Sequence, residues 1–251
     1  MGRLTDRVAV VTGAASGIGR ATAIRFGEEG ASVACLDIAA DGANQTATEI
    51  AGAGGTAKSY TCNVADPSSV DKVVGQVLAD HGQVHVLANI AGIGRFAHSH
   101  LAAVEEWNRI IGVNLTGTYL MARAVLPGML ERGSGVIVNT ASTAGISAQP
   151  YSAAYCASKG GVIMLTKSLA WEYVKSGVRI NAVAPGGVDT PIVNSFGFPD
   201  NADLTLFQRI MPPAGVFAQP EELAAAFAYV ASDEARYMTG AVVTLDGGMT
   251  C

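Results

Sequence analysis

The chain has 251 residues, of which 49% are hydrophobic and 15% charged, and it carries a formal net charge of -5. This length and apolar content suffice for one sizeable core, whereas the acidic balance argues against nucleic-acid and anionic-membrane partners. No apolar run approaches the roughly 20 residues needed to span a bilayer, and the sequence opens without a signal-peptide region. The four cysteines show neither zinc-ligand spacing nor a need for disulfides. We therefore expect a soluble, cytoplasmic protein without a metal site.

Short β-branched and apolar runs alternate with helical patterns along the chain. The first half predicts, in order, a strand at 7–12, a helix at 17–29, a strand at 32–37, a helix at 41–53, a strand at 56–61, a helix that begins at Pro67, a strand at 85–89, and a long helical stretch over 101–132 that is broken near 112–117. The second half predicts a strand at 135–140, a helix that carries Tyr155 and runs to about 176, a strand at 178–184, a helix at 220–231 and a strand at 241–245. This alternation is typical of α/β folds. We expect one Rossmann-type, doubly wound domain over residues 1–251, with a seven-stranded parallel sheet and helices on both faces.

One long irregular segment, at about 190–215, interrupts this alternation. It combines prolines and glycines with apolar side chains, namely Phe196, Phe198, Leu204, Leu206, Phe207, Ile210 and Met211. Loops of this length inside compact domains are usually functional or disordered, and this one is too apolar for permanent disorder. We interpret it as a lid over an apolar substrate, in preference to a merely structural insertion.

A glycine-rich turn joins the first predicted strand to the first predicted helix. Gly13, Gly17 and Gly19 are spaced G-x-x-x-G-x-G. Such a turn lets backbone N–H groups and a helix N-terminus meet a pyrophosphate. Tight strand–helix turns also need glycine for purely steric reasons, so the spacing alone is a weak signal.

Asp37 strengthens the dinucleotide interpretation. It ends the second predicted strand, 18 positions after Gly19, where a carboxylate can accept hydrogen bonds from a ribose diol. The same carboxylate would repel a 2′-phosphate, and neither Ser16 nor Ile38 supplies a compensating positive charge. NAD is therefore favoured over NADP, although Arg20 lies near the turn and leaves NADP use open. A solvated Asp at a strand end is the alternative.

An acid/base pair follows in the second half of the chain. Tyr155 and Lys159 stand four residues apart on a predicted helix, so they share one face, and Ser142 precedes Tyr155 by thirteen residues. A nearby positive charge favours the ionised form of a phenol, whose ordinary pKa is about 10. Each residue also has a plain structural reading, as a surface pair, as a turn serine or, for Asn114, as a helix-break residue.

The ordered set of these motifs resembles the main Tyr-x-x-x-Lys branch of the short-chain dehydrogenase/reductase family. The resemblance covers nearly the whole chain and is highly specific, because the motifs appear in family order and spacing. The residues that carry it are 12–19, Asp37, Asn63-Val64, Asn89-Ile90-Ala91-Gly92, Asn114, Ser142, Tyr155, Lys159 and Pro185-Gly186. Departures are Asn63 in place of Asp, Ile90 in place of the second Asn, and Val216 where Arg is frequent.

The resemblance implies four catalytic residues. Tyr155 would be the general acid/base, Lys159 would lower its pKa and bind the nicotinamide ribose, and Ser142 would position the substrate oxygen. Asn114 would support a water-linked proton path to Lys159. Hydride transfer to a carbonyl creates negative charge on oxygen, and a placed hydroxyl and proton donor stabilise that charge.

The resemblance also implies the cofactor contacts. Asn63 and Val64 would meet the adenine, Ala91 and Gly92 the ribose region, and Thr190 the carboxamide. The complete expected set is Gly13, Ser16, Gly17, Ile18, Gly19, Asp37, Ile38, Asn63, Val64, Asn89, Ala91, Gly92, Tyr155, Lys159, Pro185, Gly186, Val188 and Thr190. A homotetramer, built through helices around 101–132 and 155–176, is implied as well.

Several functions remain open at this point. The leading hypothesis is an oxidoreductase that transfers a hydride between NAD(H) and an apolar or cyclic secondary alcohol/ketone. Within enzymes, the alternative is an NADPH-dependent 3-oxoacyl thioester reductase, against which Asp37 argues. A dinucleotide-sensing binding protein and a scaffold protein are further alternatives, because a fold does not guarantee catalysis.

Overall fold

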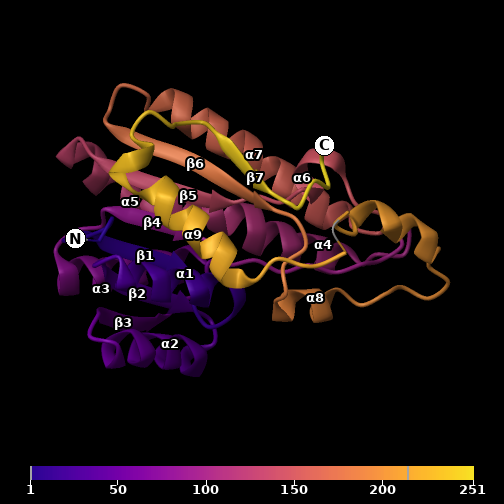
Figure 1. The fold of residues 1–251 in the computed structure, drawn as a ribbon, viewed down its shortest axis with the longest axis horizontal. Coiled ribbons are helices and arrows are strands. Elements are labelled where there is room, and N and C mark those ends of the chain that lie inside the picture. The colour runs from indigo at the N-terminus through magenta and orange to yellow at the C-terminus, as the bar shows by residue number, and fades with distance from the viewer. Residues whose placement is uncertain (1, 214) are drawn as a thin grey trace.

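A parallel sheet forms the centre of the computed structural model, which describes residues 2–213 and 215–251 (Figure 1). In these residues the sheet has seven strands in the order β3-β2-β1-β4-β5-β6-β7. The strands are β1 (Val8–Thr12), β2 (Ser32–Asp37), β3 (Thr56–Thr61), β4 (Val86–Asn89), β5 (Gly135–Thr140), β6 (Val178–Pro185) and β7 (Val242–Leu245). The chain runs outward from β1 to β3, returns to β4, and runs outward again to β7, so the order reverses between β1 and β4. The predicted doubly wound fold with seven parallel strands is confirmed.

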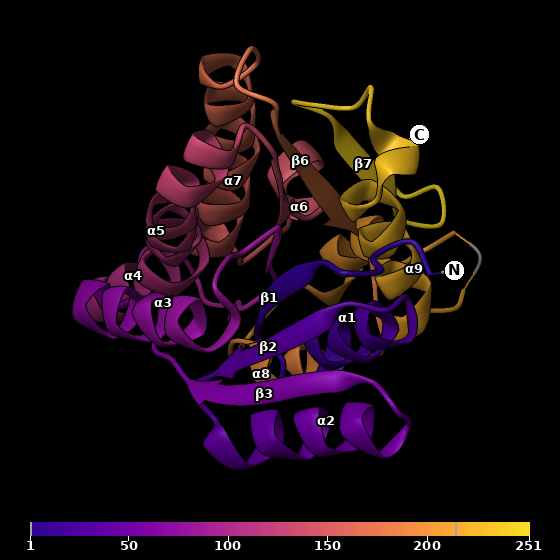
Figure 2. The same cartoon turned by 90° about the vertical axis from the view of Figure 1, so that its left-hand side faces the viewer.

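Helices cover both faces of the sheet, as Figure 2 shows. One face is covered by α1 (Gly17–Glu28), α2 (Ala40–Gly52) and α9 (Pro220–Ala231). The other is covered by α3 (Pro67–His81), α5 (Gly117–Arg132) and α7 (Ala153–Glu172). The remaining helices are α4 (Val104–Ile111), α6 (Ala144–Ser147), α8 (Pro191–Phe196), the π-helical η1 (Gly112–Thr116) and the 3₁₀-helical η2 (Leu204–Ile210) and η3 (Asp233–Ala235).

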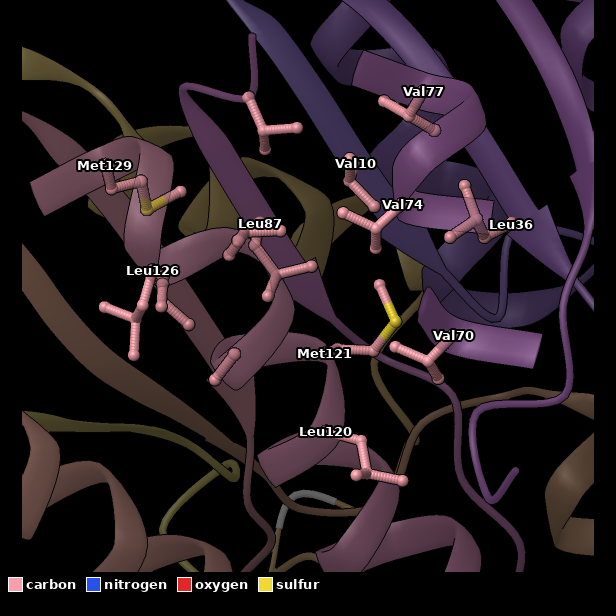
Figure 3. Close-up of a cluster of buried hydrophobic side chains, with 14 of the residues drawn as sticks. Val10, Leu36, Val70, Val74, Val77, Leu87, Leu120, Met121, Leu126 and Met129 are labelled. Carbon is pink, nitrogen blue, oxygen red and sulfur yellow. The ribbon is translucent and has the colours of Figure 1, made fainter. Parts of the chain in front are cut away.

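The core explains why these segments become strands and helices. All five residues of β1 are buried, as expected for a central strand of a parallel sheet covered on both faces. Val70, Val74 and Val77 recur at helical spacing on α3 and pack toward the sheet with Met121 of α5 (Figure 3). Asp66 begins α3 by accepting a hydrogen bond from the Ser68 amide, a common N-cap arrangement.

Three predicted boundaries differ from the structure. The expected break at 112–117 is instead a π-helical turn, so α4, η1 and α5 form one continuous helical path. The helix that carries Tyr155 ends at Glu172 rather than near 176. The segment 190–215 is not irregular throughout, because α8 and η2 lie within it. Within the described part of the chain, no helix combines the length and apolar character that crossing a bilayer demands.

Candidate active site

A cavity of about 1120 Å³ lies at the carboxyl ends of the strands. Its lining includes Asp37 at the end of β2, Pro185 at the end of β6, Tyr155 on α7 and Phe196 at the end of α8. Open parallel sheets bind ligands at this edge, near the reversal of strand order. The volume exceeds the roughly 300–1,000 Å³ of an ordinary small-molecule site, which leaves room for a dinucleotide together with a substrate.

The glycine-rich turn requires glycine for steric reasons. Gly13 and Gly17 have φ angles of +72° and +52°, which residues with side chains rarely adopt. A Cβ on Gly13 would lie 2.9 Å from the Cα of Ala91, and a Cβ on Gly19 would lie 2.5 Å from the carbonyl carbon of Gly13. The steric reading of these glycines is therefore correct, and it does not exclude a binding role.

The amino end of α1 presents backbone amides to the cavity. Amides in the first turn of a helix have no intrahelical acceptor, and the Ser16 side chain makes no cap hydrogen bond to them. Gly17, Ile18 and Gly19, which supply these amides, line the cavity. A helix N-terminus of this kind suits a phosphate, so the turn fits the pyrophosphate of a dinucleotide.

Asp37 is held in place by two backbone amides. Its Oδ2 accepts a hydrogen bond from the Ala15 amide at 3.0 Å and its Oδ1 accepts one from the Ala39 amide at 2.9 Å. Asp37 is half-buried rather than a solvated strand end. Each carboxylate oxygen keeps further acceptor capacity, and the residue lines the cavity. The carboxylate is thus oriented before any diol arrives.

Tyr155 and Lys159 share one face of α7, as their spacing predicts. Lys159 is 3% exposed, and its Nζ donates a hydrogen bond to the carbonyl oxygen of Thr140 at 2.7 Å. The same Nζ lies 5.7 Å from the centre of the Tyr155 ring. The end of β5 therefore fixes the ammonium beside the phenol.

Burial shifts the pKa values of both members of this pair away from their ordinary values. Burial raises the pKa of Tyr155 to about 12, although the Ser142 hydroxyl acts in the opposite direction. Burial lowers the pKa of Lys159 to about 8. Desolvation of the phenolate is the dominant cause at Tyr155, and a lowering of the phenol pKa by Lys159 stays a prediction. A raised phenol pKa favours the protonated form, which is a proton donor.

Ser142 lies two residues after the end of β5. The short helix α6 begins two residues further along. The Ser142 side chain is buried, and its Oγ accepts a hydrogen bond from the Ala144 amide at 3.1 Å. This bond uses an acceptor position and leaves the hydroxyl proton free to donate. The turn-serine reading and the catalytic reading are therefore both compatible with the structure.

Asn114 lies within η1, and its side chain makes hydrogen bonds to neighbouring segments. Its amide pairs twice with Ile93: Oδ1 accepts from the Ile93 N–H at 2.9 Å, and Nδ2 donates to the Ile93 carbonyl at 2.9 Å. Nδ2 also donates to Oγ of Ser158 at 3.0 Å. Asn114 is buried and is not part of the cavity wall. Its side chain fixes the segment after β4, and a proton path through it stays a prediction.

Asn89 does not reach the cavity. Its Nδ2 donates to Oδ1 of Asn139 at 2.9 Å and to the carbonyl oxygen of Thr118 at 3.3 Å. Successive side chains on a strand point to opposite faces, and this one points toward α5. The Asn89 side chain thus links β4 to β5 and α5, and a contact of this residue with the cofactor stays a prediction.

The other expected cofactor residues all line this same cavity. Besides those already described they are Ile38, Asn63, Val64, Ala91, Gly92, Pro185, Gly186, Val188 and Thr190. Their direct contact with a cofactor stays a prediction. They come from the ends of β2, β3, β4 and β6 and from the start of α8, so the fold gathers residues that lie far apart in sequence.

Three residues of the cavity region were missed by the sequence reasoning. Thr140 contacts Lys159 through its backbone carbonyl. Every residue has such a carbonyl, so the residue type could not have predicted this contact. Phe96 lies in the segment after β4 and lines the cavity. Tyr151 contacts the 190–215 segment, because its hydroxyl accepts a hydrogen bond from the Asp203 amide at 2.9 Å. For Phe96 and Tyr151, the sequence offered one signal: both are aromatic residues in segments outside the predicted strands and helices.

Comparison with known proteins agrees with this geometry. A family profile described as "Enoyl-(Acyl carrier protein) reductase" matches residues 13–250. The chain is 44% identical over 246 residues to cis-4-hydroxycyclohexanecarboxylate dehydrogenase of Sinomonas cyclohexanicum, covering 98% of this chain and 97% of the relative. It is 40% identical over 247 residues to 3-oxoacyl-(acyl-carrier-protein) reductase FabG of Thermotoga maritima, covering 98% and 99%.

A solved structure extends the similarity to three dimensions. The crystal structure of 3-ketoacyl-(acyl-carrier-protein) reductase from Brucella melitensis complexed with NADH superposes with a TM-score of 0.90 and 36% identity, covering 99% of this chain and all of that one. The profile, the relatives and the fold extend over almost every residue. The chain therefore belongs to the short-chain dehydrogenase/reductase family of oxidoreductases.

Proposed function

We propose that this protein transfers a hydride between NAD(H) and an apolar or cyclic secondary alcohol/ketone, with Tyr155 as the general acid/base. One observation carries the proposal. Ser142, Tyr155 and Lys159 line the same cavity as the glycine-rich turn and Asp37. A reactive oxygen beside the phenol would thus share one cavity with the dinucleotide.

The chain's own residues support carbonyl reduction directly. A bound nicotinamide would supply or accept the hydride. Ser142 can donate its hydroxyl proton to the substrate oxygen, and the protonated phenol of Tyr155 can deliver a proton as charge develops there. Alcohol oxidation needs the phenolate, and the charged form of Lys159 beside the ring favours that state.

The surroundings of Asp37 favour NAD over NADP. A 2′-phosphate would meet the carboxylate, and placing two like charges side by side lowers the affinity for NADP. Arg20, which could have offset that repulsion, forms an ion pair with Glu49. The neighbouring Ile38 is exposed and uncharged. Support for NADP from this chain's own residues is therefore weak.

An NADPH-dependent 3-oxoacyl thioester reductase is the second candidate. The Thermotoga and Brucella relatives carry names of that reaction class. The Sinomonas relative, in contrast, is named for a cyclic hydroxy acid. Asp37 argues against this candidate because its carboxylate disfavours NADPH. It gives no information about the substrate.

A turnover screen separates these candidates. The purified protein is offered cyclic and linear secondary alcohols, their ketones and an acetoacetyl thioester, each with NAD(H) and NADP(H), and the absorbance of the reduced nicotinamide is followed. We expect turnover of alcohols and ketones with NAD(H). Preferential NADPH turnover of the thioester would favour the second candidate, and tight dinucleotide binding without any turnover would favour a sensing protein.

We also infer a homotetramer from the family resemblance. Large apolar side chains are exposed on α4, α5 and α7, namely Trp107, Tyr119, Met164 and Trp171. Exposed apolar surface of this kind is typical of an assembly face. Light scattering on the purified chain tests this inference, and a monomeric mass would contradict it.

A further inference from the structure

The lid contacts the segment after β4 at Gly94, where an added Cβ would overlap the present position of the Phe196 ring. Gly94 is buried, and a Cβ at this position would lie 2.6 Å from Cε1 of Phe196, the last residue of α8. Real Cβ atoms do not come this close to a ring. The Phe196 carbonyl also accepts a hydrogen bond from the Phe96 amide at 3.0 Å. Gly94 and Phe96 together therefore determine where the Phe196 ring lies.

That ring touches the proposed acid/base residue. The Phe196 and Tyr155 ring centres are 5.1 Å apart with an interplanar angle of 81°, an edge-to-face pair. The Phe96 ring lies 4.7 Å from Phe196 and 5.0 Å from Phe207. Three phenyl rings from two distant segments thus form a continuous wall that ends at the phenol.

Among the described residues, the same part of the cavity holds one cation, Lys159, and no unpaired carboxylate. The charged residues among the lining are Asp37, Arg109 and Lys159. Asp37 belongs to the nucleotide region, Arg109 pairs with Glu106 through two hydrogen bonds, and Lys159 donates to Thr140. Apolar lining residues Ile192, Val193, Ile210 and Met211 complete this region. An uncharged, apolar body suits such walls.

We propose that Phe96, Phe196 and Phe207 form a subsite for a carbocyclic ring, and that the Gly94–Phe196 contact determines the specificity of the site. The inference rests on the proposed function and narrows its substrate class to uncharged secondary alcohols on a six-membered ring, with their ketones. A ring whose oxygen lies between Ser142 and Tyr155 must border Phe196, because Phe196 already touches the phenol. A rigid ring also loses less conformational freedom on binding than a linear chain of equal carbon number.

Matched alcohols test the subsite. With NAD, kcat/KM is measured for cyclohexanol and for hexan-2-ol, which have the same number of carbons. Wild type is expected to prefer the ring by about tenfold or more, since pocket contacts of this size change kcat/KM by roughly 10–200-fold. Phe196→Ala should remove most of that preference by slowing cyclohexanol oxidation, while NADH affinity stays unchanged. Leu204→Ala, which shortens an exposed lid side chain outside the cavity wall, is the control and should keep the preference.

A double-mutant cycle tests the contact itself. Gly94→Ala places a methyl group where the Phe196 ring lies, so it should reduce the ring preference nearly as much as Phe196→Ala does. In the Phe196→Ala background the same change should have little further effect, since coupled residues deviate from additivity. Proteolysis of the lid gives a readout independent of turnover: Gly94→Ala should speed cleavage within 190–215 only when Phe196 is present.

The outcomes separate this inference from the proposed function. Equal kcat/KM for both alcohols in wild type, or a Phe196→Ala variant that slows both equally, would overturn the ring subsite and leave the oxidoreductase proposal standing. Additive effects of Gly94→Ala and Phe196→Ala on ring preference and on proteolysis would overturn the specificity contact. Turnover of no alcohol or ketone at all would overturn both proposals together.

Discussion

The nucleotide region and the substrate region of the cavity differ in what forms their walls. Around Gly13, Gly17 and Gly19 the wall is mostly backbone, and any added side chain would collide or be strained. Around Tyr155 the wall is made of side chains, above all the rings of Phe96 and Phe196. The glycine-rich turn is one short stretch of chain, whereas the aromatic wall is assembled from segments about a hundred residues apart.

This difference indicates which properties can change independently. A backbone wall binds the groups that all dinucleotides share, so substitutions there should affect every reaction of the protein. A side-chain wall can change its shape without moving the backbone, so substitutions there should alter the choice and the chemistry of the substrate. Substitutions in each region test this separation.

The largest expected effect belongs to Tyr155→Phe. Loss of the phenol oxygen removes the proposed proton donor, and such groups contribute about 10²–10⁴ in rate. We therefore expect kcat to fall by this factor while NADH affinity, measured by fluorescence titration, is retained. Tyr237→Phe, at a fully exposed tyrosine, should leave kcat unchanged. Parallel loss of NADH binding would show that the two regions are not separable.

Lys159 links stability to pH. Because its folded pKa is about 8 against an ordinary 10.5, the unfolded chain holds a proton between these values that the folded chain has lost. Stability therefore rises with pH across this window. Lys159→Met removes that titration, so the stability of wild type relative to the variant should rise by about 3 kcal/mol, at ~1.4 kcal/mol per pH unit. Urea unfolding below and above the window measures it, and an unchanged difference would contradict the burial of the ammonium.

Gly19→Ala tests the backbone wall. The new Cβ would collide with the Gly13 carbonyl group, and relief of such overpacking costs about 1–3 kcal/mol. Stability and NADH affinity should both fall. Gly75→Ala is the control. Gly75 lies on α3, and a Cβ there would have no neighbouring atom outside its own helix within 4 Å, so the change should stabilise the protein by about 0.5–1 kcal/mol. Equal behaviour of the two variants would refute the steric role of Gly19.

The smallest effect concerns cofactor choice. Asp37→Asn keeps an acceptor for a backbone amide and removes the charge, so NADPH affinity relative to NADH should rise by about tenfold. Asp41→Asn removes one charge from the nearby start of α2 and should leave the ratio unchanged. Titration of each variant with both cofactors measures the ratio of the two affinities. An equal shift of this ratio in the two variants would show that the effect comes from net charge and not from the position of Asp37.

The amino-acid sequence alone was sufficient for the fold and for most of the nucleotide region. Apolar runs such as β1 and the helical spacing of Val70, Val74 and Val77 follow from local patterns. The glycine-rich turn and Asp37 are also local, because a turn's conformation depends on its own residues. The i, i+4 spacing of Tyr155 and Lys159 placed them on one face of a helix in the same way.

Tertiary structure decided what depends on distant neighbours. Asn89 and Asn114 satisfy buried partners from other elements, and burial raised the phenol pKa that a positive neighbour alone would have lowered. The Gly94–Phe196 contact joins segments whose approach no local pattern records. Desolvation and long-range packing are properties of the assembled molecule. For that reason the contacts of the substrate region follow from the tertiary structure and not from local sequence patterns.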